Sequence, residues 1–483
     1  MEEKSLKSNS ILNIIRSVLG LLFPLITFKY ASVILGPDGI GAANYAQSII
    51  TYFQLLATFG ITTYAIAEGA KLRRDPDKFK EFTCEIFTIN LLSTSISYSL
   101  LLLLSIGGLF GHHNIYVLIL SISLFFSLIG VEWMFVIYEQ FRYITLRSLF
   151  FQILSFCLLF VLVRTKNDTA EYVSLIVIST VGSSVFNYYK SRSICKIKLV
   201  KLTRIRRHLK PMLIIFGTSI ASLIYVNSDM VVLGILKSDT EVGIYAAGVK
   251  IIKAICVPIA SVGLVAVPRI SEKIVQGSIG DVETICNRVL HFMSFFIFPF
   301  LVGIFLFSKE AILLLSGPEF LSGVSVIKLL IIDVFLSPIN GFLVSQLLIP
   351  FGKQNISFYA TLGGAFGNIL LDILLIPKFS FVGAAFATVI SELIVFCTCI
   401  PFLCKKFNLL TVVNGCWQYV VGAIVIIPIY YLGIHITANY LINTIIIVFV
   451  SAALYLLFLL RMENFVANEA VQLVKKRIGL KNK

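Results

Sequence analysis

The chain has 483 residues, 58% of them hydrophobic, and a formal net charge of +15. Soluble globular domains are about 45–50% apolar, so this composition with its long apolar runs excludes an ordinary soluble enzyme and indicates a membrane protein. The positive charge lies in short segments between the apolar runs, which argues against nucleic-acid binding.

Fourteen apolar runs follow one another along the chain. A helix needs about 20 mostly apolar residues to cross a bilayer, and each run is about this long or longer. The runs are near-continuous and do not alternate with a period of two, so they predict helices and not outer-membrane strands. They cover about 11–34, 42–66, 84–106, 115–137, 146–163, 170–189, 211–235, 241–266, 286–308, 324–348, 355–376, 381–403, 415–435 and 440–460.

The distribution of cations predicts the orientation in the membrane. With a cytoplasmic N-terminus, 30 of the 40 Lys and Arg residues fall in cytoplasmic segments and at their helix ends. The positive-inside rule therefore favours both termini in the cytoplasm. No cleavable signal peptide is expected, because the first run is long enough to span and lacks a small-residue cleavage site.

A short pattern near the N-terminus recurs in the middle of the chain. Val33-Ile34-Leu35-Gly36, Gly41 and Ser48-Ile49-Ile50 are echoed by Val232-Leu233-Gly234, Gly243 and Lys250-Ile251-Ile252. The densest cationic segment, 190–210, separates six runs from eight. Because six is even, the second copy starts on the same side of the membrane as the first, which predicts a parallel repeat.

This pattern predicts an all-α polytopic membrane protein with about fourteen transmembrane helices, in two six-helix lobes plus a C-terminal helix pair. The basic linker would contact anionic lipid headgroups, and the C-terminal tail would be an amphipathic helix on the cytoplasmic surface or a frayed basic tail. The expected parts are an N-lobe at 1–190, a linker at 191–210, a C-lobe at 211–403, the helix pair at 404–461 and the tail at 462–483.

Four cations are the candidate substrate-binding residues. A charge near the bilayer centre costs several kcal/mol unless it faces a cavity or a partner. Lys250 lies about ten residues into the eighth run, near the midplane, and Lys253 follows at i+3 on the same face. Arg16 lies in the first run, where it could instead extend to the interface, and Arg269 lies near the cytoplasmic mouth. A cationic cavity suits an anionic substrate such as a diphosphate or an acidic sugar.

Five carboxylates within the runs are candidates for coupling to protons or sodium ions. Asp333 and Glu392 lie deep in the tenth and twelfth runs, and Asp229, Glu132 and Asp372 lie nearer one end of theirs. These side chains could carry an ion, or they could neutralise the deep lysines as structural pairs. Spacing alone does not choose between the two roles.

Other motifs predict no catalytic residue, metal or cofactor. Asp75-Pro76-Asp77 matches a glycosyltransferase pattern, but the proline predicts a turn in a short cytoplasmic loop. His112 and His113 are adjacent, which is a poor spacing for one metal site. No phosphate-binding glycine loop is present, so direct use of ATP is not expected. The short outer loops leave no room for a polymerase or ligase, the alternative from the class of enzymes.

Four groups of residues resemble bacterial polysaccharide exporters, the O-antigen and capsule flippases of the multidrug/oligosaccharidyl-lipid/polysaccharide exporter superfamily. The first group is Tyr225-x-x-x-Asp229, Leu233-Gly234, Val242-Gly243-x-Tyr245, Lys250-Ile251 and Val267-Pro268-Arg269. The others are Leu35-Gly36-Pro37-x-Gly39-x-Gly41; Val131-Glu132-Trp133 with Glu139-x-Phe141-x-Tyr143-Ile144 and Arg147; and Ile376-Pro377 with Gly383-Ala384-Ala385-x-Ala387-Thr388 and Glu392. Asp372 departs from the asparagine expected there.

The resemblance implies a V-shaped, two-lobed flippase that moves an undecaprenyl-diphosphate-linked oligosaccharide across the cytoplasmic membrane by alternating access. It also implies drive by an ion gradient, with H⁺ or Na⁺ as the ion, and a polysaccharide polymerase as a possible partner. A peptidoglycan-precursor flippase and a drug/cation antiporter of the same superfamily are the alternatives among transporters. The lysines and the added helix pair count against the antiporter, which would prefer an anionic cavity.

Overall fold

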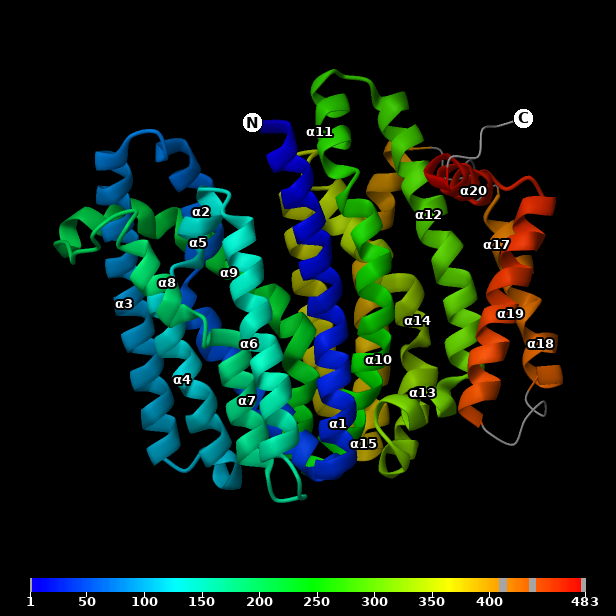
Figure 1. Cartoon of the computed structure of the whole chain (residues 1–483), viewed down its shortest axis with the longest axis horizontal. Coiled ribbons are helices and arrows are strands. Elements are labelled where there is room, and N and C mark those ends of the chain that lie inside the picture. Colours follow the sequence, from blue (N-terminus) through cyan, green and yellow to red (C-terminus); the bar gives the residue numbers. More distant parts are fainter. Residues whose placement is uncertain (1, 408–414, 434–439, 479–483) are drawn as a thin grey trace. The chain divides into compact units, whose positions relative to one another are not determined.

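The computed structural model describes the backbone of residues 2–407, 415–433 and 440–478. Side chains are described in the same ranges apart from 2–19, 21–22, 202, 440–441, 470 and 473–478. Within this part of the chain all regular structure is helical and no strand occurs (Figure 1), which confirms the predicted all-α class. Twelve helical segments among the described residues are long and apolar enough to cross a membrane.

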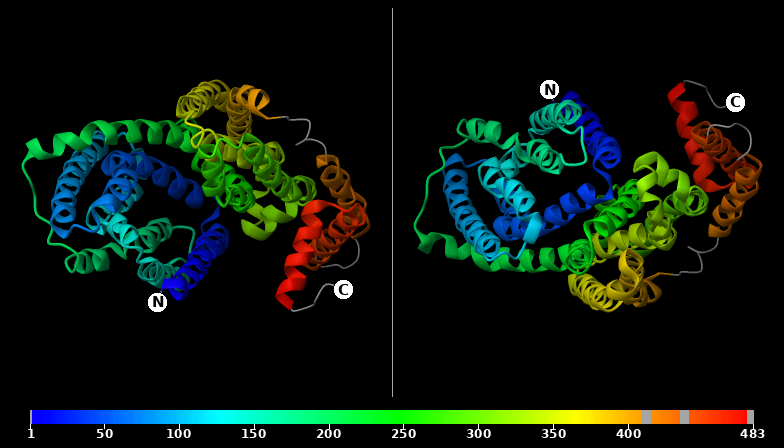
Figure 2. Two further views of the ribbon diagram at one scale, coloured as in Figure 1. Left: turned by 90° about the horizontal axis from the view of Figure 1, so that it is seen from above. Right: turned by 90° about the horizontal axis from the view of Figure 1, so that it is seen from below.

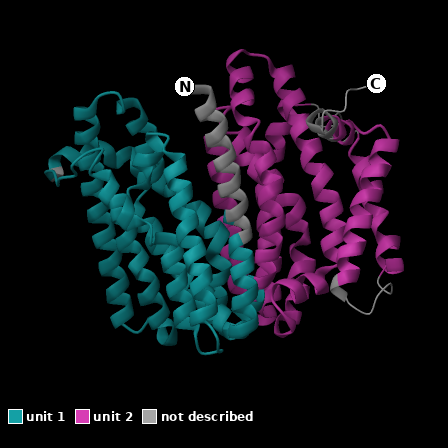
Figure 3. Cartoon of the chain, in the orientation of Figure 1, with its two compact units in different colours: residues 1–246 teal, residues 247–483 magenta. Residues whose placement is uncertain are grey.

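The chain divides into two compact units, residues 1–246 and residues 247–483 (Figure 3). The division falls within one helix, α10, so its first residues belong to unit 1 and the rest to unit 2. Within each unit most helices are seen nearly end-on from above and below, so they run along a common direction (Figure 2). The finer division expected from the sequence, with a boundary at 190–210, stays a prediction.

Unit 1 holds the described elements from α1 to α9 and the start of α10. They are α1 (Glu2–Thr58), α2 (Ile61–Leu72), α3 (Pro76–Ile106), η1 (Gly111–His113), α4 (Asn114–Gly130), α5 (Glu132–Ile137), α6 (Phe141–Leu162), α7 (Thr169–Val181), α8 (Ser184–Ser191), α9 (Leu202–Leu236) and α10 (Asp239–Leu264).

Unit 2 continues from α10 to the end of the described chain. Its elements are α11 (Val267–Val275), α12 (Ile279–Leu306), α13 (Ser308–Leu315), η2 (Pro318–Gly323), α14 (Val324–Gly341), η3 (Phe342–Leu347), α15 (Gln354–Lys406), α17 (Cys416–Ile424), α18 (Ile426–Gly433), α19 (Tyr440–Arg461) and α20 (Phe465–Ile478).

Two helical elements contain one non-helical residue each, where the sequence predicts two separate spans. In α1 this residue is Gly36, with φ 68° and ψ −176°, a conformation that glycine adopts without a Cβ penalty. In α15 it is Ser380, with φ 52° and ψ −135°. The candidate spans there, Phe23–Leu72 and Gln354–Lys406, are 50 and 53 residues long. Each is long enough for two crossings of about 20 residues, and the total of fourteen stays a prediction.

The two copies of the repeated pattern meet in unit 1 at Gly41 and Gly243. A Cβ on Gly41 would lie 1.8 Å from the carbonyl oxygen of Asp239, and one on Gly243 would lie 2.0 Å from that of Pro37. Asp239 precedes Gly243 by four residues and Pro37 precedes Gly41 by four, so the contact is reciprocal, as in a two-fold pair. The backbones of α1 and α10 touch here because both glycines lack a side chain.

The predicted C-terminal amphipathic segment forms the helix α20. Asn464 caps it, since Val466 N and Ala467 N lie 3.0 and 3.3 Å from its Oδ1. Val466 and Ala467 are buried in a cluster with Tyr419 and Leu459. This packing ties the start of α20 to the preceding helices of unit 2, and its place on a membrane surface stays a prediction.

Replacing Asn464 with alanine should lower the free energy of unfolding by about 1 kcal/mol, the typical cost of losing an N-cap side chain. Asn464→Asp is the matched variant, because it keeps the cap acceptor and removes only the donor that lies 2.6 Å from Gln418 Oε1. In detergent, the free energy of unfolding should be highest for the wild type, lower for the aspartate variant and lowest for the alanine variant. An alanine variant as stable as the wild type would contradict the capping role.

Candidate substrate and ion site

The lysine-bearing part of α10 packs along α14 and the following η3 at three successive levels in unit 2. A Cβ on Gly248 would lie 2.7 Å from Val326, and Cys256 Sγ lies 3.6 Å from the carbonyl oxygen of Asp333. At the third level a Cβ on Gly263 would lie 1.9 Å from the Gln346 side chain. Residue numbers rise together on both helices, so α10 and α14 run parallel, and Lys250 and Lys253 lie between the first two levels.

The structure brings Lys253, Asp333 and Glu392 together around Cys256. Lys253 precedes Cys256 by one helical turn on the same face, and Cys256 contacts the backbone of Asp333. Asp333 and Asn340 lie seven residues apart on one face of α14, and Asn340 donates a hydrogen bond to the Glu392 carboxylate on α15. Asp333 and Glu392 are buried, with exposed fractions of 6% and 7%. Three candidate residues from α10, α14 and α15 therefore form one charged cluster.

Glu392 is held in place by an amide from the neighbouring helix. Asn340 Nδ2 donates to the Glu392 carboxylate and lies 2.9 Å from the Glu392 carbonyl oxygen. Both side chains are buried, and buried polar groups are stabilised when they are hydrogen-bonded in this way. Sequence reasoning missed Asn340. Its only signal was a polar residue deep in an apolar run.

The cations of the predicted substrate site differ in exposure. Lys250 is half-buried and Lys253 is exposed on α10, and Arg269 is exposed on α11. The Arg16 side chain lies outside the described residues.

The remaining unit 2 candidate, Asp372, is fully buried on α15, and Asn368, which is 1% exposed, precedes it by one turn.

Two candidate carboxylates, Asp229 and Glu132, belong to unit 1 and have other neighbours. Asp229 is 6% exposed and accepts a hydrogen bond from the hydroxyl of Tyr245. Glu132 begins α5, directly after the helix break at Val131, and lies 2.7 Å from Arg147. The Arg147 side chain is only 6% exposed, so Glu132 balances a buried cation. This pairing favours a structural role for Glu132.

A buried carboxylate outside the candidate set organises the N-terminal end of α9. Glu85 on α3 is 1% exposed, and its Oε2 lies 2.6 Å from Arg207 NH2 and 2.8 Å from His208 Nε2. His208 Nδ1 lies 2.7 Å from the hydroxyl of Tyr64 on α2. The network joins α2, α3 and α9. Sequence reasoning missed it because Arg207 and His208 belong to the basic linker, where the cations were assigned to topology.

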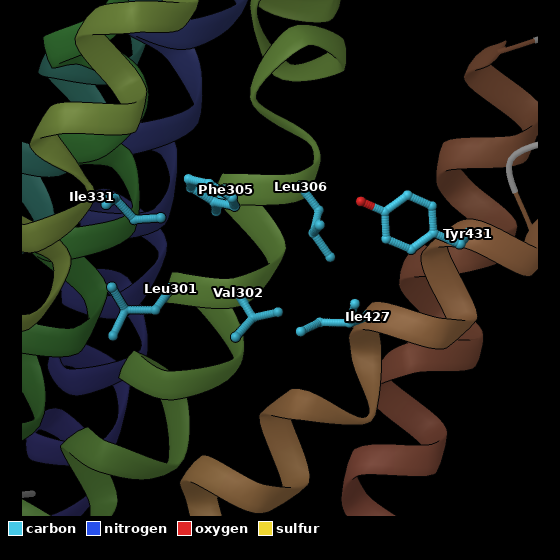
Figure 4. Close-up of a pocket in the computed structure, with 7 residues that line it drawn as sticks. All are labelled: Leu301, Val302, Phe305, Leu306, Ile331, Ile427 and Tyr431. Atoms are coloured by element: carbon cyan, nitrogen blue, oxygen red, sulfur yellow. The ribbon is translucent and has the colours of Figure 1, made fainter.

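An apolar pocket of about 370 Å³ lies between α12, α14 and α18 in unit 2 (Figure 4). Its lining is Leu301, Val302, Phe305, Leu306, Ile331, Ile427 and Tyr431. It contains no titratable group other than the phenol of Tyr431. Such a lining suits a hydrocarbon and cannot stabilise a diphosphate, so the pocket is chemically distinct from the charged cluster on α10.

Comparison with known proteins gives a family model and a relative that matches about three quarters of the chain. A model described as "Polysaccharide biosynthesis protein" matches residues 6–273, more than half of the chain. The chain is also 24% identical over 383 residues to the "Putative O-antigen transporter" of Escherichia coli (strain K12). That alignment covers 77% of this chain and 91% of the relative.

Two solved structures share the fold. "Lipid II flippase MurJ, inward closed conformation" superposes with a TM-score of 0.74 at 18% identity, over 95% of this chain and 99% of that one. An inward-facing "multidrug resistance MATE family transporter of the MOP superfamily" gives a TM-score of 0.65 at 15% identity, over 80% and 94%. At these identities the likeness establishes the fold alone.

Proposed function

We propose, from the premise that this chain belongs to the polysaccharide biosynthesis protein family, that it is a flippase for a lipid-linked oligosaccharide. The substrate class is an undecaprenyl-diphosphate-linked repeat unit of O-antigen or capsule, moved across the bacterial cytoplasmic membrane by alternating access. The similarity to a putative O-antigen transporter over 77% of the chain supports this class. The motif resemblance found in the sequence is confirmed by the family match.

The observation that carries the proposal is the pair of cations on α10. Lys250 and Lys253 lie on one face of a helix that is long and apolar enough to span a membrane. A cation in such a position is costly unless it serves a partner or a hydrated path, and a diphosphate is a suitable anionic partner. Arg16 and Arg269 are the further proposed contacts for the anionic headgroup or glycan.

The carboxylates are proposed to couple transport to H⁺ or Na⁺. Asp333 and Glu392 are the first candidates, because both are buried and the Asp333 backbone contacts Cys256, which lies one helical turn from Lys253. A carboxylate that exchanges between an ion and a lysine would link ion occupancy to the state of the cationic site. Asp229, which accepts a hydrogen bond from Tyr245 in unit 1, and the buried Asp372 on α15 are secondary candidates.

Lys250→Ala should reduce surface polysaccharide at least about tenfold in a deletion strain that carries the variant gene. The loss corresponds to a charge-assisted contact of about 1.5–3 kcal/mol, and about 1.4 kcal/mol is a factor of ten. Lys250→Arg should retain part of the export, because it keeps the charge. The measurement is polymer at the cell surface, normalised to the amount of transporter in the membrane.

Lys328→Ala is the matched control, because Lys328 is an exposed lysine on α14 that lies 5.5 Å from the Phe305 ring. We expect this variant to export normally. Full export by Lys250→Ala at a normal protein level would remove Lys250 from the site. Normal surface polymer in the deletion strain, with loss of viability or of drug resistance instead, would favour a peptidoglycan-precursor flippase or a drug antiporter.

Both termini are proposed to be cytoplasmic, as the cation distribution indicates. A reporter enzyme fused after Lys483 that is active only outside the cytoplasm should therefore be inactive in the same complemented strain.

A further inference from the structure

We propose that His112, His113 and Asp239 form a binding site for a divalent transition-metal ion of the zinc type. The two histidines lie in η1, between α3 and α4, and Asp239 is the first residue of α10. All three belong to predicted outer loops of unit 1, outside the charged cluster on α10 and α14. Nothing in the proposed flippase chemistry uses them.

The three side chains converge from segments that are far apart in the sequence. Asp239 Oδ2 lies 2.9 Å from His112 Nε2, and Asp239 Oδ1 lies 2.6 Å from His113 Nε2, across 127 and 126 residues of chain. One ligand atom from each residue falls within a group no wider than 4.8 Å. In a tetrahedral zinc site with bonds of about 2.0–2.2 Å, ligand atoms lie about 3.4 Å apart, so a small movement completes the geometry.

The donor set selects the type of ion. Imidazole nitrogen suits Zn²⁺ and neighbouring transition metals, whereas Mg²⁺ and Ca²⁺ prefer sites made of oxygen alone. Two imidazoles and one carboxylate give three protein ligands, which leaves the fourth position of a tetrahedral ion for water. The carboxylate also offsets part of the charge of the metal.

The surroundings hold two of the ligands and leave the third free to move. His113 is 8% exposed, and its ring packs at 4.5 Å between centroids on the ring of Tyr45. Asp239 is 19% exposed, and its carbonyl oxygen lies against Gly41 at the contact of α1 and α10. His112 is 73% exposed, so it can adjust to the ion and provides an open route for entry. Such supports fix ligand orientation in metal sites.

A bound ion would connect η1 to the first turn of α10, the helix that carries Lys250. Without metal the same atoms make hydrogen-bonded histidine–aspartate pairs. The metal-bound and metal-free states can therefore be distinguished by calorimetry and by thermal unfolding. Adjacent histidines alone are a poor site. The third donor, which only the tertiary structure supplies, changes that assessment.

The test is metal binding by the purified full chain in detergent, prepared with an affinity tag that contains no histidine. ZnCl₂ is titrated calorimetrically, and thermal unfolding is recorded with and without the ion. CoCl₂ provides a spectroscopic readout, because tetrahedral nitrogen and oxygen ligands give visible absorption bands. We expect binding of one Zn²⁺, a raised midpoint of unfolding, and no comparable effect of MgCl₂.

His112→Ala and Asp239→Asn should each weaken zinc binding by about 100-fold or more, because even loss of a supporting outer group costs about 10–100-fold. His112 is exposed, so its replacement should leave the fold intact. His291→Ala, which changes a histidine of unit 2, is the control and should bind as the wild type does. Absence of binding, equal binding of Mg²⁺, or unchanged affinity in the His112 and Asp239 variants would each overturn the site.

Discussion

Gly243→Ala should destabilise the protein by about 3 kcal/mol or more and sharply reduce the folded fraction in the membrane, at the upper end of the range for overpacked sites. The added Cβ would lie 2.0 Å from the carbonyl oxygen of Pro37, which is a backbone atom and cannot rotate away. Gly243 lies within α10, so alanine meets no conformational penalty of its own there. The whole effect comes from forcing α1 and α10 apart.

Gly41→Ala should have a similar effect, because its Cβ would lie 1.8 Å from the carbonyl oxygen of Asp239 on the other helix. Gly217→Ala is the control. Gly217 is exposed on α9, where an added Cβ would meet no atom within 4 Å, and alanine is the better helix former by about 1 kcal/mol. Folded yield and thermal unfolding in detergent should distinguish the destabilised Gly41 and Gly243 variants from the Gly217 variant. Wild-type stability of Gly243→Ala would contradict the backbone contact.

Glu85→Ala should cost about 3 kcal/mol of unfolding free energy, the lower end of the range for breaking a buried ion pair. Removal of this carboxylate leaves His208, which is 6% exposed, without its hydrogen-bond acceptor. The Arg207 side chain is 61% exposed and can turn to water, so its share of the loss is small. The remaining cost is mainly that of a buried imidazole whose Nε2 has lost its carboxylate partner.

Glu81→Ala is a control on the same two helices. Glu81 also lies on α3 and pairs with an arginine of α9, Arg204, at 3.0 Å, but the two side chains are 49% and 59% exposed. Exposed pairs contribute about 0–1 kcal/mol, so this change should hardly alter unfolding. A double-mutant cycle of Glu85→Ala with His208→Ala should show strong coupling. Additive effects, or equal losses for Glu81 and Glu85, would contradict the network.

The sequence by itself predicted the membrane class and the helical fold, because the length of an apolar run and the absence of alternation reflect what a bilayer demands of any segment. It also identified the glycines at 41 and 243 as matching positions of a repeat. The length and periodicity of an apolar run are properties of one segment, and the repeat is found by comparing the sequences of two segments. The exact count of fourteen spans stays a prediction, since Gly36 and Ser380 interrupt helices that otherwise continue.

Only the tertiary structure decided which polar residues meet. Lys253, Asp333 and Glu392 come from three helices, and their grouping depends on how α10, α14 and α15 are rotated against one another. His113 and Asp239 are 126 residues apart, and no local pattern encodes their contact. Whether an apolar segment can cross a membrane depends on the transfer of its own side chains to lipid. Whether two polar residues meet depends on how separate helices pack, and the sequence of neither helix alone encodes that packing. The sequence therefore predicted which segments are apolar enough to cross a membrane, and the packing determined which polar residues lie together.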